Sequence, residues 1–161
     1  MAPVLLKKVD FLDYPMDFNL KVNKKRLFGD HKTWRGLFFG VLAGILITFL
    51  QVLLLRFDFF QQITLLNLSF SNFYIFGFLM GFGAIFGDAV ESTLKRQINY
   101  KEGKSLIVFD QLDFVVGALI FLSFFYLPSL YILLVILLIT PFLHLLVNVL
   151  AYLLKLKDVW W

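Results

Sequence analysis

Apolar residues gather into four long blocks along the 161-residue chain, and polar or charged segments separate the blocks. The first block is about as long as a helix must be to span the hydrocarbon core of a bilayer. The approximate bounds of the blocks are 36–55, Asn72 into the charged stretch 87–96, Phe114 to Pro128, and Ser129 onward. The pattern predicts an all-α fold, a polytopic membrane bundle of about four transmembrane helices.

The second and third blocks are short when only their apolar residues are counted. Each reaches the length of a membrane span only if its charged end belongs to the helix. We therefore expect the charges at 88–96 and 110–113 to lie at membrane depth, near one interface of the bilayer. The segment between them is then a loop that joins the second and third helices.

Apolar residues make up 60% of the chain, whereas soluble domains contain about 45–50%. This excess predicts one membrane domain over 1–161, with a basic segment at 1–35 and a helix bundle at 36–161. Cysteine is absent, which excludes disulfides, a thiolate nucleophile and a cysteine-bound zinc. The start of the chain lacks the apolar core and cleavage site of a signal peptide.

The net charge of +4 is unevenly distributed. Lysine and arginine concentrate in 1–35, in 95–104 and in the tail, whereas the connections 56–72 and 127–129 carry only Arg56. With four spans, every basic segment falls on one side, so both termini and these loops are expected in the cytoplasm of a multi-pass cell-membrane protein. The basic residues form no stripe with exposed aromatics, and no nucleic-acid partner is expected.

The second block ends in the stretch GDAVESTLKR, which contains two acids and two bases. On a helix, Asp88, Glu91 and Lys95 share one face because they are spaced i, i+3 and i+7. Ser92 and Arg96 flank that face. An ion-pair belt at the membrane surface is one interpretation, since Glu91 and Lys95 form an ordinary i, i+4 pair.

A second acidic pair, Asp110 and Asp113, begins the third helix. Because a loop of about a dozen residues joins the two helices, Asp88 can meet Asp110 or Asp113. Unpaired carboxylates at this depth are unfavourable, and a divalent cation relieves their repulsion. Carboxylate oxygens suit Mg²⁺, which usually also binds substrate phosphates. The acidic groups therefore favour phosphoryl or nucleotidyl transfer.

A further candidate site is the stretch LFGDHKTWRG, in which Asp30 or Thr33 can cap the first helix. The free N–H groups of a helix N-terminus beside Lys32 and Arg35 are typical of a phosphate site. The alternative is that both bases only follow the positive-inside rule. His31 in the same stretch is weak evidence for a metal ligand.

Two features of the apolar blocks predict helix packing. His144 follows Pro141 in the fourth block, with Asn148 one turn later, and we favour hydrogen bonding between helices over catalysis for this pair. Glycines at small-xxx-small spacing let helices approach closely. They are Gly40 and Gly44 in the first helix and Gly77, Gly81, Gly83 and Gly87 in the second.

Three phrases in order, GDAVESTLKR, KEG and DQLD, resemble the signature of the membrane cytidylyltransferases. That family includes bacterial CDP-diacylglycerol synthases and archaeal CDP-archaeol synthases. The phrases YPMDF, GDHKTWRG and DQLDF resemble the archaeol branch more closely. Where the diacylglycerol branch has Asp-Arg in the last phrase, this chain has Asp110 and Gln111. The similarity covers nearly the whole chain.

The resemblance implies that CTP and a lipid phosphate react to a CDP-activated lipid and pyrophosphate, with Mg²⁺ required. It leaves open whether a monovalent cation assists. By the family motif, Asp88, Asp110 and Asp113 hold the metal and act in catalysis with Lys95 and Arg96. The implied substrate-binding residues are Gly29, Asp30, Lys32, Thr33, Arg35, Glu91, Ser92, Lys101 and Gln111.

Three alternatives stand beside this hypothesis: a CDP-diacylglycerol synthase acting on phosphatidate, a small cation transporter, and a non-catalytic membrane protein. Members of the family usually carry a further transmembrane helix ahead of the position of Met1, so we expect either a shorter protein than its relatives or a sequence that starts late. The bilayer is a partner in every case, and the sequence leaves open whether the chain forms a homodimer.

Overall fold

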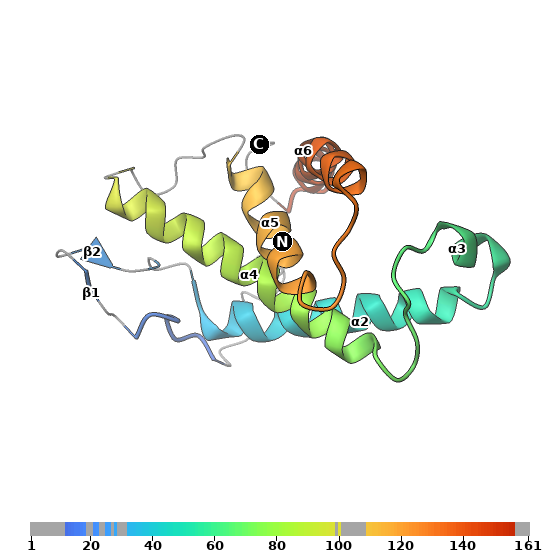
Figure 1. Cartoon of the computed structure of the whole chain (residues 1–161). Coiled ribbons are helices and arrows are strands. Elements are labelled where there is room, and N and C mark those ends of the chain that lie inside the picture. Colours follow the sequence, from blue (N-terminus) through green and yellow to red (C-terminus); the bar gives the residue numbers. More distant parts are fainter. Residues whose placement is uncertain are drawn as a thin grey trace.

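The computed structural model describes residues 12–18, 21–22, 25–26, 28, 32–98, 100 and 109–156. In this part of the chain two short antiparallel strands precede a series of helices (Figure 1). The strands are β1 (Lys21–Val22) and β2 (Lys25–Arg26), and the helices are α2 (Trp34–Leu54), α3 (Asp58–Ile63), α4 (Phe73–Gln97), α5 (Phe109–Leu122) and α6 (Leu130–Leu153).

The predicted helical membrane bundle is confirmed, with α2, α4, α5 and α6 in the four apolar blocks. Among the described residues, α2, α4 and α6 are long and apolar enough to cross a membrane, while α5 is shorter. The charged ends of the second and third blocks belong to helices, because α4 continues through Arg96 and α5 begins at Phe109. Helix α6 continues through Pro141.

The third helix ends at Leu122 rather than at Pro128, so its predicted C-terminal bound was wrong. The Ser123 hydroxyl donates to the Ile120 carbonyl at 2.7 Å, and the Tyr126 amide donates to the Leu122 carbonyl at 2.9 Å. A serine hydroxyl competes in this way with helix continuation. The proline then disfavours helical geometry in the residue before it, so the apolar block continues as a turn and an extended link.

Helices α2 and α4 pack backbone to backbone through glycines. A Cβ atom added at Gly44 would lie 2.5 Å from the Gly77 carbonyl oxygen and 3.0 Å from the Gly81 Cα atom. A Cβ atom at Gly81 would lie 2.9 Å from the Gly40 carbonyl oxygen. In a bilayer, where no hydrophobic effect drives helices together, such close contact supplies the attraction. The close packing expected from the small-residue spacing is confirmed.

The opposite side of α4 packs against α5 in the same manner. A Cβ atom at Gly83 would lie 2.7 Å from the Gly117 carbonyl oxygen, and one at Gly87 would lie 3.0 Å from the Gly117 Cα atom. A Cβ atom at Gly87 would also collide with the Asp113 carbonyl oxygen. Gly117 is the partner that the sequence analysis did not single out. Helix α4 is therefore held between two neighbours by separate glycine faces.

The far end of the bundle is closed by α3 and the residues after it, which the sequence analysis treated as a plain connection. Leu68 is buried there with Val52, Phe76 and Leu122, so one side chain each from the connection, α2, α4 and α5 forms a small core. The Asn72 side chain fixes the connection, accepting from the Ser69 amide and donating to the Asn67 carbonyl, both at 2.8 Å.

Helix α6 lies beside α5 and leaves most of its surface uncovered (Figure 1). Its Leu138 and Phe142 side chains are 69% and 75% exposed. Exposed apolar side chains on a spanning helix face lipid hydrocarbon. On the covered side, the His144 ring packs against Phe114 of α5 with centroids 6.0 Å apart, and Asn148 bonds His144 within α6 at 3.3 Å.

The helices alternate in direction, which brings the start of α2, the end of α4 and the start of α5 to one end of the bundle. Ion pairs join these three helix ends. Figure 1 places β1 and β2 near this end and α3 at the other. The described basic residues before α2 and at the end of α4 therefore lie at the same end of the bundle.

We expect Gly87→Ala to lower the stability of the protein, because the new methyl group must displace the first turns of α5. Overpacking of this kind costs about 1–3 kcal/mol. Thermal unfolding of the purified protein in detergent, followed by tryptophan fluorescence, measures the loss. Gly36→Ala is the matched control, because a Cβ atom there meets only the Thr33 hydroxyl oxygen at an ordinary 3.7 Å. Equal midpoints for the two variants would contradict the close packing.

Candidate functional site

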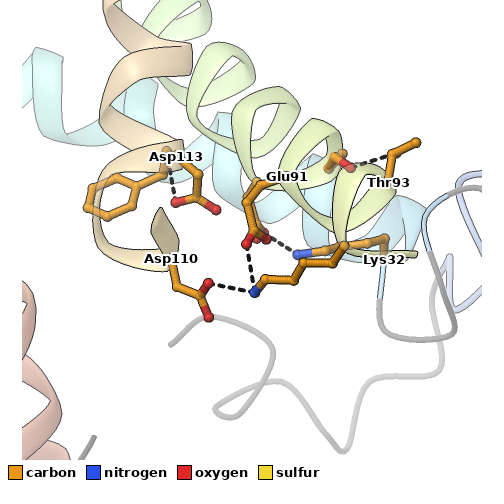
Figure 2. Close-up of polar contacts among 9 residues, drawn as sticks. Lys32, Glu91, Thr93, Asp110 and Asp113 are labelled. Atoms are coloured by element: carbon orange, nitrogen blue, oxygen red, sulfur yellow. Dashed lines mark hydrogen bonds and ion pairs between the residues drawn. The ribbon is translucent and has the colours of Figure 1, made fainter. Parts of the chain in front are cut away.

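Charged side chains from three parts of the chain meet at the end of the bundle where α4 stops and α5 starts. Figure 2 shows Glu91 of α4 and Asp110 and Asp113 of α5 around one space, with Lys32 reaching in from the residues before α2. The cluster around this space consists of Lys32, Asp88, Glu91, Lys95, Asp110 and Asp113.

Three of the carboxylates form a tight group. Asp88, Glu91 and Asp113 each offer one oxygen atom, and these three oxygens lie within 4.8 Å of one another. The Asp113 carboxylate also accepts a hydrogen bond from the Phe114 amide at 2.6 Å, which fixes its orientation. Carboxylates this close repel one another unless a cation lies between them. Carboxylate oxygens are hard donors, the kind of ligand that Mg²⁺ prefers.

Lys32 connects the residues before α2 to this acidic group. Its ammonium group lies 2.5 Å from an oxygen of Asp88, and its side chain is 19% exposed. The Asp88 side chain is 45% exposed, so the carboxylate also faces open solution. Two features that the sequence presented as separate candidates, the LFGDHKTWRG stretch and the acidic end of α4, are therefore parts of one site.

Lys95 joins α4 to α5 by pairing with a carboxylate on each. Its ammonium group lies 2.6 Å from Glu91 and 2.5 Å from Asp110, and only 12% of its side chain is exposed. A nearly buried ammonium group is strongly unfavourable without such partners. Asp110 is thereby held by Lys95 and lies outside the group of three carboxylates, where Glu91 takes the third place.

Among these six side chains, four carboxylates face two ammonium groups, which leaves a formal charge of −2. The excess lies at the ends of apolar helices, where charge is expensive to maintain. A divalent cation offsets it, and the three clustered oxygens provide adjacent ligand positions. The residues present therefore fit a Mg²⁺ ion.

The start of α2 is built by strand-like pairing with residues 12–18. The Met16 amide donates to the Lys32 carbonyl at 2.8 Å, and the Trp34 amide donates to the Tyr14 carbonyl at 2.9 Å. Thr33 caps the helix, because its hydroxyl oxygen accepts from the Gly36 amide at 3.2 Å. These contacts fix the backbone from which Lys32 extends to Asp88.

The other residues predicted from the sequence lie around this centre or outside the described part of the chain. Arg35 pairs with Asp13 at 2.9 Å. Ser92 is buried on α4, while Arg96 and Gln111 are partly exposed near the charged cluster. Gly29, Asp30, His31 and Lys101 lie outside the residues that the structure describes.

Two acidic residues before α2 were not predicted as members of the site. Asp13 pairs with Arg35, and Asp17 is almost fully buried, with its carboxylate 3.3 Å from the Phe28 amide. Asp17 lies in the phrase YPMDF, which resembles the archaeol branch, and Asp13 directly precedes that phrase. Two acids close to a proline in a short segment, which cannot form a hydrophobic core by itself, are the sequence feature that could have identified them.

A family model and curated relatives similar to this chain point to the same protein family. The model of the CarS-like CDP-archaeol synthase family matches residues 12–161. The chain is 41% identical to CDP-archaeol synthase of Methanocaldococcus jannaschii over 141 residues, which cover 87% of this chain and 78% of that protein. It is 43% identical to CDP-archaeol synthase of Methanococcus vannielii over 148 residues, covering 91% of this chain and 83% of the relative.

A solved structure is also similar over almost the whole fold. It was described as structural insight into an intramembrane enzyme for archaeal membrane lipids biosynthesis. The TM-score is 0.70 at 25% sequence identity, and the match covers 91% of this chain and 92% of that one. The helix arrangement described above is therefore an arrangement known from an enzyme that works within the membrane.

We expect Mn²⁺, used as a spectroscopic probe, to bind this protein through the three clustered carboxylates. Asp113→Asn removes one negative charge at nearly constant size and should raise the Kd for Mn²⁺ at least about 10-fold, or about 1.4 kcal/mol. Electron paramagnetic resonance of free Mn²⁺ in a titration measures the Kd. Asp58→Asn is the control, because Asp58 is an exposed carboxylate of α3 at the other end of the bundle. Equal weakening in both variants would contradict a localised site.

Proposed function

This chain belongs to the CDP-archaeol synthase family, and we propose that its carboxylate cluster carries out the transfer of CMP from CTP to the phosphate of an archaeal ether lipid. The second product is pyrophosphate. The chain is accordingly a multi-pass membrane enzyme of lipid biosynthesis, a cytidylyltransferase.

One observation carries the assignment of the cluster to this reaction. Asp88, Glu91 and Asp113 gather within 4.8 Å at the ends of helices whose remaining length is apolar. A nucleotide triphosphate approaches such a place from water, and a lipid phosphate approaches it from the bilayer. Carboxylates at the ends of apolar helices are accessible from both directions, which supports the meeting of the two phosphate groups there.

In the proposed reaction an oxygen of the lipid phosphate attacks the α-phosphorus of CTP. A new P–O bond forms there, and the bond from the α-phosphorus to the oxygen that bridges it to the β-phosphorus breaks. The electron pair leaves with pyrophosphate. The attacking oxygen is already anionic, so the protein needs no general base. Its task is to hold two anionic groups in line and to offset their charge.

Asp88, Glu91 and Asp113 would hold Mg²⁺ in this site. When bound there, the ion supplies positive charge to the phosphate oxygens of the reacting groups. The protein contributes orientation, because Asp113 is fixed by the Phe114 amide and Asp88 by Lys32. We assign Asp110 to the positioning of Lys95 on the strength of their ion pair.

The basic side chains are proposed to bind the phosphates of CTP and of the lipid. Lys95 is held in one place by carboxylates from two helices, which gives an ammonium group of fixed position near the reacting centre. Lys32 and Arg35 flank the N-terminus of α2, where backbone N–H groups favour anions. Further substrate contacts, assigned by the family motif, are Thr33, Ser92, Arg96, Gln111, Gly29, Asp30 and Lys101, the last three outside the described residues.

The same geometry argues against an ion pathway. A transport route needs charged groups along the depth of the membrane, as in proton relays and pumps. The clustered acids on α4 and α5 gather at one end, and the lengths of both helices below them are apolar. Membership of an enzyme family likewise argues against a non-catalytic scaffold.

We expect the purified protein to transfer radiolabel from α-labelled CTP to a geranylgeranyl ether-lipid phosphate, with release of pyrophosphate. Asp113→Asn should reduce the rate by about 100-fold or more, because one of the charges that organise the reacting phosphates is lost. Thin-layer chromatography of the extracted lipid measures the transfer. Asp58→Asn should retain the wild-type rate.

A parallel reaction with diacyl phosphatidate separates the two branches of the family. Preference for the ether lipid is the expected result. Preference for phosphatidate would instead assign the chain to CDP-diacylglycerol synthesis, and folded wild-type protein that labels neither lipid would refute the proposed reaction.

We also propose that the site faces the cytoplasm, where CTP is available. The basic segments 1–35 and 95–104 support this orientation by the positive-inside rule. The chain has no cysteine, so a single introduced cysteine reports its own side of the membrane. Ile98 at the end of α4 and Phe57 at the other end of the bundle suit this test, being 67% and 62% exposed.

A membrane-impermeant maleimide is expected to label Phe57→Cys in intact cells and Ile98→Cys only in inverted vesicles. Each variant is the control for the other, because both replace a large exposed apolar side chain. Gel shift of the labelled protein measures the result. The reverse pattern would place the carboxylate cluster outside the cell and contradict the orientation.

A further inference from the structure

The two short strands before α2 form a basic hairpin that has no role in the proposed reaction so far. Strand β1 (Lys21–Val22) pairs with β2 (Lys25–Arg26) in antiparallel register. Between Phe18 and Gly29 the sequence contains four bases and no acid. The four bases are Lys21, Lys24, Lys25 and Arg26. A segment of this composition attracts anions, and its pairing shows where on the hairpin the attraction is strongest.

The pairing register places two like charges directly opposite each other. Lys21 pairs with Arg26, and Val22 pairs with Lys25. Directly opposite residues of an antiparallel pair lie on one face of the ribbon with Cβ atoms about 4.5–5.5 Å apart, and like charges in this arrangement are destabilising. An anion bound to both bases would offset their repulsion. The register therefore points to an anionic ligand on the face of Lys21 and Arg26, while Lys25 belongs to the opposite face.

A buried carboxylate closes the base of the hairpin. Asp17 is only 2% exposed, and its carboxylate accepts a hydrogen bond from the Phe28 amide at 3.3 Å. This bond joins the chain ahead of β1 to the chain that follows β2. Burial of a carboxylate is expensive unless hydrogen bonds satisfy it. Attraction to anionic lipids requires only charge near the membrane surface, so a hairpin fixed at this cost indicates a ligand for which position matters.

The register of α2 against α4 brings the hairpin to the charged end of α4. Gly40 lies against Ile85, and Lys32 pairs with Asp88. Because the two helices run in opposite directions, residues that precede Lys32 lie towards the C-terminal turns of α4. Strand β2 accordingly lies beside α4, and Figure 1 shows the hairpin near this end of the bundle. The hairpin is therefore a neighbour of the carboxylate cluster.

The bases already assigned to the reaction site balance acids before they balance a substrate. Lys32, Lys95 and Arg35 each have a carboxylate partner. The six clustered side chains carry a formal charge of −2, so a divalent cation brings them only to neutrality. The triphosphate of CTP carries several further negative charges. The hairpin is an adjacent source of positive charge that contains no acid of its own.

We propose that Lys21 and Arg26 bind the terminal phosphates of CTP, and that Asp17 positions the hairpin for this contact. The inference rests on the proposed function and deepens it, since it names the groups that hold the part of CTP released as pyrophosphate. The terminal phosphates are assigned here because the α-phosphate must lie at the carboxylates with the lipid phosphate. The hairpin precedes α2 and lies past the helix end, on the side from which CTP arrives.

Neutral variants within the hairpin test the proposal. Lys21→Gln and Arg26→Gln each remove one base from the paired face. Lys25→Gln is the matched control, because it removes a base of the same hairpin from the opposite face. The purified protein in a neutral detergent is titrated with radiolabelled CTP in the presence of Mg²⁺ and without lipid, and equilibrium dialysis gives the Kd. Unlabelled CMP and inorganic pyrophosphate are used as competitors.

Lys21→Gln and Arg26→Gln are each expected to raise the Kd for CTP about 10-fold, or about 1.4 kcal/mol. The affinity for pyrophosphate should fall as well, while the affinity for CMP, which lacks the terminal phosphates, stays at the wild-type value. Lys25→Gln should match wild type with all three ligands. Since the opposed bases repel each other in the free protein, neither Lys21→Gln nor Arg26→Gln should lower the midpoint of thermal unfolding.

An unchanged Kd for CTP in Lys21→Gln and Arg26→Gln overturns the proposal, and it is the result that attraction to anionic bilayer lipids alone predicts. Equal weakening in all three variants shows a general attraction to charge and also overturns it, as does an equal loss of affinity for CMP and CTP. Binding of CTP by the wild-type protein keeps these outcomes separate from a failure of the proposed function, which would leave wild type without affinity for CTP.

Two variants of Asp17 test its positioning role. Asp17→Ala removes the acceptor of the Phe28 amide and should weaken CTP binding while CMP binding is unchanged. Asp17→Asn keeps an acceptor oxygen in the same place and should restore part of the affinity for CTP. A wild-type Kd for CTP in Asp17→Ala overturns the positioning role. Loss of CMP affinity together with CTP affinity, as an unfolded variant would show, assigns Asp17 to the general stability of the fold and overturns it too.

Discussion

The close approach of α4 to α2 and α5 is the constraint on which the rest of the structure depends. Glycines on two faces of α4 remove the side chains that would separate the three backbones. Without them, α5 would stand off by the width of at least a methyl group, and the Asp113 oxygen could not come within 4.8 Å of Asp88 and Glu91. Gly87 makes the coupling direct, because its backbone lies against the Asp113 carbonyl. In a bilayer this packing also supplies the main attraction between helices, so one set of residues stabilises the bundle and positions the site.

Close packing brings several carboxylates together, and the two lysines offset the repulsion between them. Lys95 lies between Glu91 and Asp110, and Lys32 lies against Asp88, so no described lysine in the cluster stands apart from the acids. These pairs tie α4 to α5 and to the residues before α2 through the clustered carboxylates. A divalent cation would offset the remaining negative charge of these side chains, and with it the charge of anionic substrates. Cation binding and the stability of the fold are therefore linked at this cluster, because a buried charge depends on its partners.

Most of the helical framework could be predicted from the sequence because apolar blocks of spanning length leave few alternatives. The glycine contacts of Gly40, Gly44 and Gly81 were also predictable, since their spacing repeats on one helix face. The end of α5 at Leu122 could not be predicted, because the apolar run continues past it. A single serine hydroxyl there redirects the backbone. The clustered acidic and basic residues were identifiable, and so was the Glu91–Lys95 pair within α4, but Asp13, Asp17 and the ion pairs between separate parts of the chain were not. Periodicity places Glu91 and Asp88 on one face, yet only the register of α5 against α4 decides that Asp113 joins them and that Asp110 pairs with Lys95.

Helix α5 has a charged start and an apolar remainder, an arrangement that suits two substrates of different solubility. One substrate is soluble in water and the other in hydrocarbon, and the reacting atoms of both are charged. A rigid helix that carries carboxylates in its first turns and an apolar wall further along fixes the depth at which the two phases meet. The position of the carboxylate cluster in the bundle is thus a property of α5 and of the glycines that hold it.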